Sequence, residues 1–273
     1  LTLMGRKVIY DCHENLPMQI LQKDWLPKPV RWMLAPAIWL AEWSGARFLA
    51  GVVVARDQVL KRFPRRKAVL VRNYPSPEAV RILSQGIPVE QRRNIVIYTG
   101  GISRVRGIAE LVEAFREIEI RDAELWLVGE FDDFTFQKEL AAKLPANVKW
   151  LGWMAHTEVL KLYQHAKLGA LLLYPTPSHR NSQPIKLYEY LAAGLPVIAT
   201  DLPEFAASLE GCAVLVNPLD VQQIRLAIAE ILSDEKRISE MSATARQHAA
   251  SRYSWEPEGQ RLLDFCKELI AHG

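Results

Sequence analysis

Short apolar runs alternate with amphipathic stretches along the chain, and the alternation is most regular after residue 92. Short apolar runs bounded by turn residues are typical of buried strands, whereas apolar residues at helical spacing are typical of helices that cover a sheet. The strands predicted in this part lie at 94–101, 123–130, 148–153, 168–176, 196–201 and 213–218. The predicted helices lie at 107–118, 133–144, 156–166, 184–194, 219–232, 235–251 and 255–271. Because strands alternate with helices, we expect parallel sheets built from βαβ units.

The first part of the chain repeats this alternation over a shorter length. Strands are predicted at 7–11, within 47–56 and at 67–75. The aromatic segment 23–46 is predicted to be partly helical and broken by its prolines. Residues 76–92 are polar and contain prolines, which is typical of a linker.

Two such series of strands and helices predict an α/β protein with two Rossmann-like, doubly wound parallel-sheet domains. We place the first domain at 1–91, the second at 92–254, and a final helix at 255–273 that packs back on the first domain. Open α/β sheets bind ligands at the carboxyl ends of their strands, so the site is expected there.

Composition and charge narrow the classes of function. The chain has 273 residues, of which 49% are hydrophobic and 24% charged, and its formal net charge is +3. This charge is too small to predict a nucleic-acid partner. The cysteines, Cys12, Cys212 and Cys266, lie far apart without metal-ligand spacing, so we expect reduced thiols in a cytoplasmic protein.

The stretch NSQPIKLYEYLAAGLPVIATDLPEF, at 181–205, carries the clearest chemical pattern. Pro184 suits the first position of a helix, which leaves the N–H groups of Ile185 and Lys186 free to bind an anion. A lysine there opposes the helix dipole unless an anion is bound, and Glu189 one turn later can accept hydrogen bonds from a ribose. The pattern indicates a nucleoside diphosphate. The alternative is a solvated ion pair between Lys186 and Glu189, the usual state of such pairs.

The residues after this helix favour a ligand site over a surface pair. Gly194 suits the end of the helix, and Pro196 suits the beginning of the next strand. The helix would therefore begin at the carboxyl edge of the sheet, where ligands bind.

The same stretch resembles the signature of the family 4 retaining glycosyltransferases, which have the two-domain GT-B fold. The resemblance continues through IVIYTGGISRVRGIAELVEAF, LWLVGE and VKWLGWMAHTEVLKLYQHAKLGALLLYP, and it includes YDCHENLP and YSWEPEGQRLLDFCKEL. It covers nearly the whole chain and is most specific between residues 94 and 205. It implies an enzyme that transfers a hexosyl-type sugar from a nucleotide-diphosphate sugar to an acceptor with retention of anomeric configuration.

The resemblance assigns roles to residues of the helix start. The family usually has two glutamates eight positions apart; the second falls on Glu189, with a role in holding the ribose, and the first falls on Asn181. An amide at Asn181 still offers hydrogen bonds to the donor sugar, although it carries no charge. Pro184, Ile185 and Lys186 belong to the same donor-binding segment.

The family also has a basic pair after the first strand of the donor domain. At the beginning of this segment the family usually has a glycine followed by an arginine. This chain has Gly100 and Gly101 there, and the arginine is therefore absent. Arg106 falls where the family has a lysine before a glycine, and we take it as the first candidate for the diphosphate, with Arg104 as the second. The alternative for both arginines is a solvated loop position.

Three further residues are expected to border the donor. Glu130 matches a donor-side loop of the family, and Trp153 and Met154 match the segment that meets the base. The alternative for Trp153 is plain core packing.

The resemblance names His13, together with Arg106 and Lys186, as catalytic. His13 falls on a family histidine that approaches the diphosphate or the reacting sugar, and the cations would stabilise the departing nucleoside diphosphate. The family reacts on the front side, with the leaving phosphate assisting deprotonation of the acceptor. We expect no metal and no cofactor beyond the nucleotide-sugar co-substrate, and we expect FDDF at 131–134 in a surface loop.

The acceptor implied by the resemblance is a bacterial cell-envelope or exopolysaccharide glycan, or a lipid-linked precursor. The segment 25–43 holds Trp25, Trp32, Trp39 and Trp43 beside basic residues, which is compatible with peripheral contact at the inner face of the membrane. We favour the alternative, a core helix pair, because prolines interrupt the segment.

Other interpretations stay open at this point. The first domain is expected to be incomplete, because about 90 residues are short for a typical domain. An epimerase or phosphorylase of the same architecture is one alternative. A non-catalytic nucleotide-sugar-binding subunit is another, favoured by Asn181, by Gly101 and by the short first domain.

Overall fold

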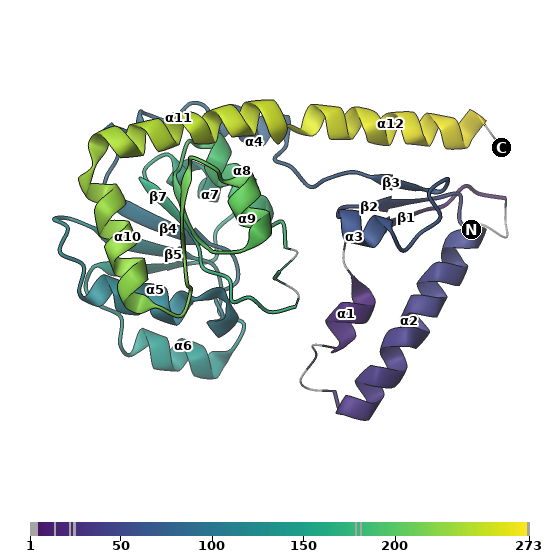
Figure 1. Cartoon of the computed structure of the whole chain (residues 1–273), viewed down its shortest axis with the longest axis horizontal. Helices are drawn as coiled ribbons and strands as arrows, with labels where there is room; N and C mark the ends of the chain where they lie inside the picture. Colours follow the sequence, from purple (N-terminus) through teal and green to yellow (C-terminus); the bar gives the residue numbers. More distant parts are fainter. Residues whose placement is uncertain are drawn as a thin grey trace. The chain divides into compact units, whose positions relative to one another are not determined.

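The computed structural model describes residues 5–13, 15–21, 23, 26–177, 179–180 and 182–271. The chain forms two compact units, one of Leu1–Tyr74 with Ser254–Gly273 and one of Pro75–Tyr253 (Figure 1). The division therefore falls after Tyr74 and not at residue 91 as predicted.

The misplaced boundary has a physical cause in the segment that was taken for a linker. Helix α4, Pro77–Leu83, begins there, and its cap Ser76 accepts a hydrogen bond from the Ala79 N–H at 3.2 Å. Ala79 and Leu83 are buried in the core of the second unit. Proline at the start of a helix is favourable, so this proline marks a helix and not a break.

The second unit is built on a six-stranded parallel sheet with the order β6-β5-β4-β7-β8-β9. The strands are β4 (Ile95–Thr99), β5 (Glu124–Val128), β6 (Val148–Gly152), β7 (Leu168–Leu171), β8 (Val197–Thr200) and β9 (Ala213–Val216). The chain builds outward from β4 through β5 to β6, then returns to add β7, β8 and β9 on the other side of β4. This is the predicted doubly wound order. The reversal between β4 and β7 is the point where such sheets bind ligands.

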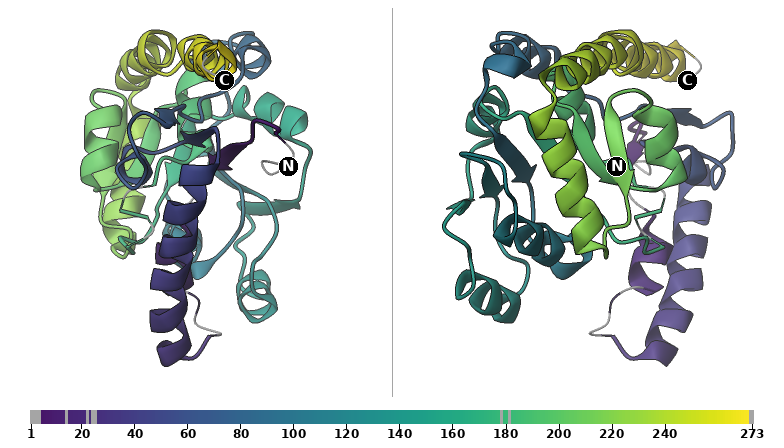
Figure 2. Two further views of the ribbon diagram at one scale, coloured as in Figure 1. Left: turned by 90° about the vertical axis from the view of Figure 1, so that its right-hand side faces the viewer. Right: turned by 60° about the vertical axis from the view of Figure 1, so that its left-hand side comes forward.

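Helices cover both faces of this sheet (Figures 1 and 2). They are α5 (Ile108–Arg116), α6 (Phe134–Ala141), α7 (His156–Tyr163), α8 (Ile185–Ala192), α9 (Pro203–Ser208), α10 (Val221–Ser233) and α11 (Glu235–Arg252). Val96 and Tyr98 of β4 join the core beneath α5 and α10, whereas Ile95 and Ile97 join the core beneath α7 and α8. The alternation of strand side chains thus supplies two apolar layers from one strand.

The first unit has a three-stranded parallel sheet in the order β1-β2-β3. Its elements are β1 (Ile9–Cys12), α1 (Leu16–Leu21), α2 (Lys28–Phe48), β2 (Gly51–Val54), α3 (Asp57–Leu60), β3 (Ala68–Leu70) and α12 (Trp255–Ala271). Helix α12 packs on this sheet: a Cβ on Gly51 would lie 2.6 Å from Cζ of Phe265, so a larger residue there would displace the Phe265 ring.

Helix α2 corrects the prediction for 23–46. It is one helix of 21 residues with Pro36 inside it, and only Ala35 and Ala46 are buried. Trp32 and Met33 are 73% and 67% exposed. The core helix pair favoured above is therefore wrong for these side chains. Pro36 removes one helical hydrogen bond but does not end the helix.

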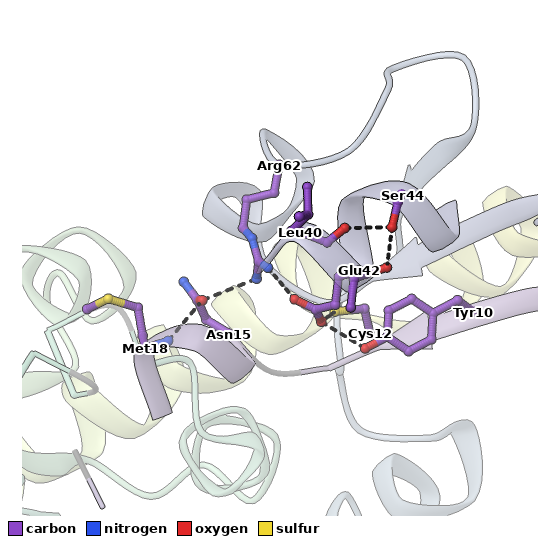
Figure 3. A network of polar contacts seen from close by, with 9 residues as sticks. Tyr10, Cys12, Asn15, Met18, Leu40, Glu42, Ser44 and Arg62 are labelled. Carbon is purple, nitrogen blue, oxygen red and sulfur yellow. Dashed lines mark hydrogen bonds and ion pairs between the residues drawn. The ribbon is translucent and has the colours of Figure 1, made fainter. Parts of the chain in front are cut away.

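A partly buried polar network connects α2 with β1 and α1 (Figure 3). Glu42 of α2 accepts a hydrogen bond from the Tyr10 hydroxyl at 2.9 Å and forms an ion pair with Arg62. Arg62 also donates to Oδ1 of Asn15 at 3.1 Å, and the same oxygen accepts from the Met18 N–H at 3.4 Å. The network thereby holds the segment that follows β1.

Candidate functional site

A pocket of about 540 Å³ opens at the carboxyl ends of β4 and β5, beside the point where the strand order reverses. Its lining comes from the ends of these strands, from the loop after β6 and from α7 and α8. It brings together eight of the predicted site residues, namely Gly100, Gly101, Glu130, Trp153, Met154, Ile185, Lys186 and Glu189.

The start of α8 differs by one residue from the prediction. Pro184, with φ −69° and ψ 131°, is the cap, and Ile185 is the first helical residue. An extended ψ is normal for a cap, and Pro fixes only φ. Within the described residues, the N–H groups of Ile185 and Lys186 have no hydrogen-bond acceptor. The helix start therefore offers two amides, as expected from the sequence.

Lys186 is a buried residue of α8. Its Nζ donates to the carbonyl of Thr99 at the end of β4 and lies 4.2 Å from the ring centroid of Tyr98. In the part of the chain described, no carboxylate forms an ion pair with it. Burial and, to a lesser degree, the charge of Arg106 lower the pKa of Lys186 to about 7, while Glu189 opposes the shift. An anion in the pocket would relieve this unfavourable burial of charge.

The glycine turn after β4 lies directly against this ammonium. Gly100 has φ +109°, and a Cβ there would lie 2.8 Å from Nζ of Lys186 and 3.8 Å from Nη1 of Arg106. Gly129, after β5, would bring a Cβ to 2.0 Å from the Gly100 carbonyl oxygen. Glycine at both positions lets the two loops approach each other and leaves the space in front of the Lys186 ammonium open.

Glu189 is 3% exposed, and both of its oxygens are held. His156 Nε2 lies 2.7 Å from Oε1, and the Tyr163 hydroxyl donates to Oε2 at 3.2 Å. Tyr163 also shares a 2.7 Å hydrogen bond with the Thr99 hydroxyl. Each carboxylate oxygen has a second lone pair, so Glu189 can still accept a hydrogen bond from a ligand. A solvated pair with Lys186, the alternative above, does not describe this buried residue.

The two candidate arginines occupy different places. Arg106 lies near Lys186 and Tyr98. Its charge therefore lowers the pKa of Lys186 and opposes the burial that raises the pKa of Tyr98. Arg104 instead pairs with Glu139 of α6 and lies 4.6 Å from the ring centroid of Phe136. Neither arginine lines the pocket itself, but Arg106 lies beside Gly100, which does.

The walls of the pocket hold residues that sequence reasoning missed. His156 and Tyr163 come from α7. Asp132 comes from the FDDF segment, which lies in an exposed loop as expected and also lines the pocket. A Cβ on Gly101 would lie 2.9 Å from Oδ1 of Asp132. A carboxylate therefore stands beside the position where the resemblance leads one to expect an arginine.

The structure also decides the alternative for Trp153 and gives the place of His13. Trp153 is 70% exposed at the pocket, so core packing is wrong for it. His13 belongs to the first unit, where its Nε2 lies 3.0 Å from Oδ2 of Asp11. Asn181 lies outside the described residues. His179, not predicted, is near the cations: burial lowers its pKa, and Arg106 and Lys186 add to the effect.

The described residues contain no group of three or more His, Cys, Asp or Glu residues arranged to hold a metal ion. Among the helices that the structure describes, none has the length and apolar character needed to cross a membrane.

Comparison with known proteins identifies the family and several relatives of this chain. The family model for glycosyl transferases group 1 matches residues 81–248. The chain is 28% identical over 200 residues to a D-inositol 3-phosphate glycosyltransferase of Corynebacterium urealyticum, covering 67% of this chain and 45% of that protein. It is 22% identical over 210 residues to an MMP alpha-(1->4)-mannosyltransferase of Mycolicibacterium hassiacum, covering 72% and 50%. The chain thus spans about half the length of these relatives.

Solved structures share its fold. A crystal structure of Anabaena Alr3699/HepE in complex with UDP and glucose gives a TM-score of 0.70 at 20% identity, covering 97% of this chain and 72% of that chain. Sucrose-phosphate synthase from Thermosynechococcus elongatus gives 0.65 at 21% identity, covering 97% and 68%. The predicted α/β fold of GT-B type is confirmed.

Proposed function

We propose a sugar-transfer reaction on the premise that this chain belongs to the family of glycosyl transferases group 1. In this reaction a hexosyl-type sugar moves from a nucleotide-diphosphate donor to a hydroxyl of an acceptor, with retention of anomeric configuration. The chain's second unit, Pro75–Tyr253, binds the donor, and its first unit serves the acceptor side.

The observation that carries the proposal is the buried ammonium of Lys186, which has no ion-pair partner among the described residues. It lies against the glycine turn at Gly100, beside Arg106 and close to two amides without acceptors. A cationic site of this kind is unfavourable when empty and favourable when a diphosphate fills it. Glu189 then accepts hydrogen bonds from the ribose, and the exposed Trp153 forms an apolar wall beside the nucleoside.

The same groups account for catalysis. As the bond between C1 of the sugar and the β-phosphate oxygen breaks, negative charge grows on the phosphate. Lys186, Arg106 and the helix start are aimed at that charge before the reaction begins, and such a site stabilises the transition state more than the ground state. The acceptor oxygen bonds to C1 on the same face, and its proton passes to the leaving phosphate. His13 is proposed as a further catalytic residue, and no metal is required.

The donor site is tested by calorimetric titration of the chain with UDP, GDP, ADP, CDP and TDP. UDP is the first choice, because the structure of Alr3699/HepE contains it. We expect one nucleotide to bind and its affinity to collapse in Lys186→Ala and in Glu189→Ala. The exposed Lys161→Ala on α7 is the matched control and should bind as the wild type does. If the folded protein binds none of the five nucleotides, the proposal is wrong.

Asp132 favours a second candidate, a non-catalytic nucleotide-sugar-binding protein. Its carboxylate occupies the space beside Gly101, where the family's arginine would add positive charge. A site with one cation fewer would bind a donor and accelerate its cleavage less. Release of nucleoside diphosphate from a bound nucleotide sugar, followed over time, separates the two: steady release supports the transferase, and binding without release supports the second candidate.

The acceptor is proposed to be a cell-envelope or exopolysaccharide glycan or a lipid-linked precursor, reached at the cytoplasmic face of a membrane. Helix α2 supports membrane contact with an exposed apolar face, formed by Pro29, Trp32, Met33, Pro36, Ala37 and Leu40. Its one carboxylate, Glu42, is paired with Arg62, whereas Lys28 and Arg47 near its ends are exposed. Flotation with anionic vesicles should carry the wild type but not Trp32→Ser; an absence of binding even to anionic lipid removes this part of the proposal.

A further inference from the structure

Arg92 is a buried arginine of the second unit that the mechanism above does not use. It is 4% exposed, and no carboxylate within the described residues pairs with it. Its donors go to backbone carbonyls: Nε to Ile87 at 2.9 Å, Nη1 to Tyr163 at 3.3 Å and Ala166 at 3.2 Å, and Nη2 to Ala193 at 3.0 Å. Burial lowers its pKa to about 10, and Arg246 adds to the effect, so the guanidinium is charged at neutral pH.

Two of the carbonyls that Arg92 contacts belong to the ends of helices. Tyr163 is the last residue of α7, and Ala193 is the C-cap of α8. Carbonyls at a helix end have no partner inside the helix and carry partial negative charge. One planar guanidinium therefore caps both helices and sets the distance between their ends.

These helix ends adjoin the carboxylate of the donor site. The carbonyl of Tyr163 is held by Arg92, and its hydroxyl donates to Oε2 of Glu189 at 3.2 Å. On α8 the N–H of Ala193 donates to the carbonyl of Glu189 at 2.9 Å. The ring of Tyr163 also packs edge-on against Tyr190, with centroids 5.1 Å apart. Arg92 thus fixes Glu189 from both sides without touching it.

We propose that Arg92 is a positioning residue for donor binding, which orients the Glu189 carboxylate toward the ribose by clamping Tyr163 and Ala193. The inference rests on the proposed function, because it assigns Glu189 to the ribose hydroxyls. Lysine cannot replace Arg92 in this role: its ammonium is a point charge on a flexible stem and does not hold two helix ends at a fixed separation.

The test compares a nucleoside diphosphate with its 2′,3′-dideoxy counterpart, with the base that binds the wild-type chain best. Loss of the hydroxyls should weaken wild-type binding by about tenfold or more, because the carboxylate is then left without its ligand partner. In Arg92→Lys we expect the ribonucleotide to bind about tenfold more weakly and the dideoxynucleotide to bind within about twofold of wild type. Arg93→Lys is the matched control: Arg93 is exposed, pairs with Glu124 and should leave both affinities unchanged.

A merely structural role gives a different result. If Arg92→Lys weakens both nucleotides equally, or retains the preference for the ribonucleotide, the positioning role is wrong. Tyr163→Phe keeps the clamp and removes only the hydroxyl that reaches Glu189, so it should also lose the preference. If Tyr163→Phe still prefers the ribonucleotide, then Arg92 does not position Glu189 through Tyr163. This result decides the question even if Arg92→Lys does not fold. Absence of any binding by the wild type refutes the proposed function, and the inference with it.

Discussion

Helices α8 and α2 depart from the usual distribution of side chains in opposite directions. Helix α8 buries Lys186 and Glu189 along with its apolar residues, whereas α2 leaves Trp32, Met33 and Leu40 exposed. A buried charge and an exposed apolar face are the two observations that packing alone does not explain. We therefore propose a binding surface at each helix, for an anion at the start of α8 and for an apolar partner along α2.

The difference has its origin in what surrounds each helix. Helix α8 lies between the sheet and α11, so its residues from Lys186 to Ala192 are all buried. Helix α2 packs on α1 and the small sheet through one face only, with Ala35 and Ala46 as its buried residues. Burial is thus a property of position in the fold, and apolar composition alone does not predict it.

The largest effect that tests this comparison is on stability. Leu191 on α8 is fully buried, so Leu191→Ala should cost about 2–5 kcal/mol of unfolding free energy through lost burial and a cavity. Leu40 on α2 is 54% exposed, so the same substitution there should change stability by no more than about 0.5 kcal/mol. Denaturant unfolding, followed for the transition of each unit, measures both. Equal losses at the two leucines would contradict the contrast between the helices.

The second effect separates binding from stability at Lys186. Lys186→Met removes the ammonium from the diphosphate site, and we expect affinity for the nucleoside diphosphate to fall about 100-fold or more. Because methionine needs no hydration, the free energy of unfolding should rise by about 1–4 kcal/mol. Calorimetric titration and denaturant unfolding measure the two quantities. The exposed Lys161→Met should change neither, and a loss of stability in Lys186→Met would show that the ammonium supports the fold.

The strands and helices of the second unit were largely predictable, because buried strands and amphipathic helices differ in period. The six predicted strands are present, and so is each predicted helix. Helices α4 and α9 were missed, since both are short and begin at a proline that was taken as a sign of a turn or linker. Pro36 misled in the same way: it lies inside α2, where packing elsewhere along the helix outweighs one lost hydrogen bond.

The site was predictable where its residues share one segment of sequence. Lys186, Ile185 and Glu189 stand at the start of one helix, and Gly100 follows one strand, so a local pattern was enough. His156, Tyr163 and Asp132 reach the pocket from other segments, and only the order of strands brings them there. A signal for His156 existed, because it begins the helix that follows β6, at the carboxyl edge of the sheet where ligands bind.

The third effect follows from the pKa of Lys186, which burial lowers to about 7. A diphosphate favours the protonated amine and so raises this pKa when it binds. Below about pH 7 the amine is protonated in the free and in the bound protein, so the affinity is at its maximum. Above about pH 7 the protein must take up a proton when it binds the diphosphate. The affinity should therefore fall by up to about tenfold per pH unit. Titration in buffers of different ionisation enthalpy measures that uptake.

A control isolates the lysine from the titration of the phosphate itself. Lys186→Arg keeps its charge across this range, so its affinity should stay flat where the wild type declines. The lowered pKa of Lys186 affects folding in the opposite sense. Between about pH 7 and the pKa of the lysine in the unfolded chain, the folded chain binds fewer protons than the unfolded chain does. The free energy of unfolding therefore rises with pH over this range. Equal pH profiles for wild type and Lys186→Arg would contradict the assignment of Lys186 to the diphosphate.

The smallest effect concerns the arginines near the glycine turn. Arg106 lies beside Lys186, so Arg106→Ala should weaken nucleoside diphosphate binding by about tenfold. Arg104 forms an exposed pair with Glu139, so Arg104→Ala should change the affinity by less than about twofold. The two residues share one short helical turn and one chemistry, so only their surroundings separate them. Equal losses would mean that Arg104 leaves Glu139 for the ligand, and that the positive site is larger than Lys186 and Arg106.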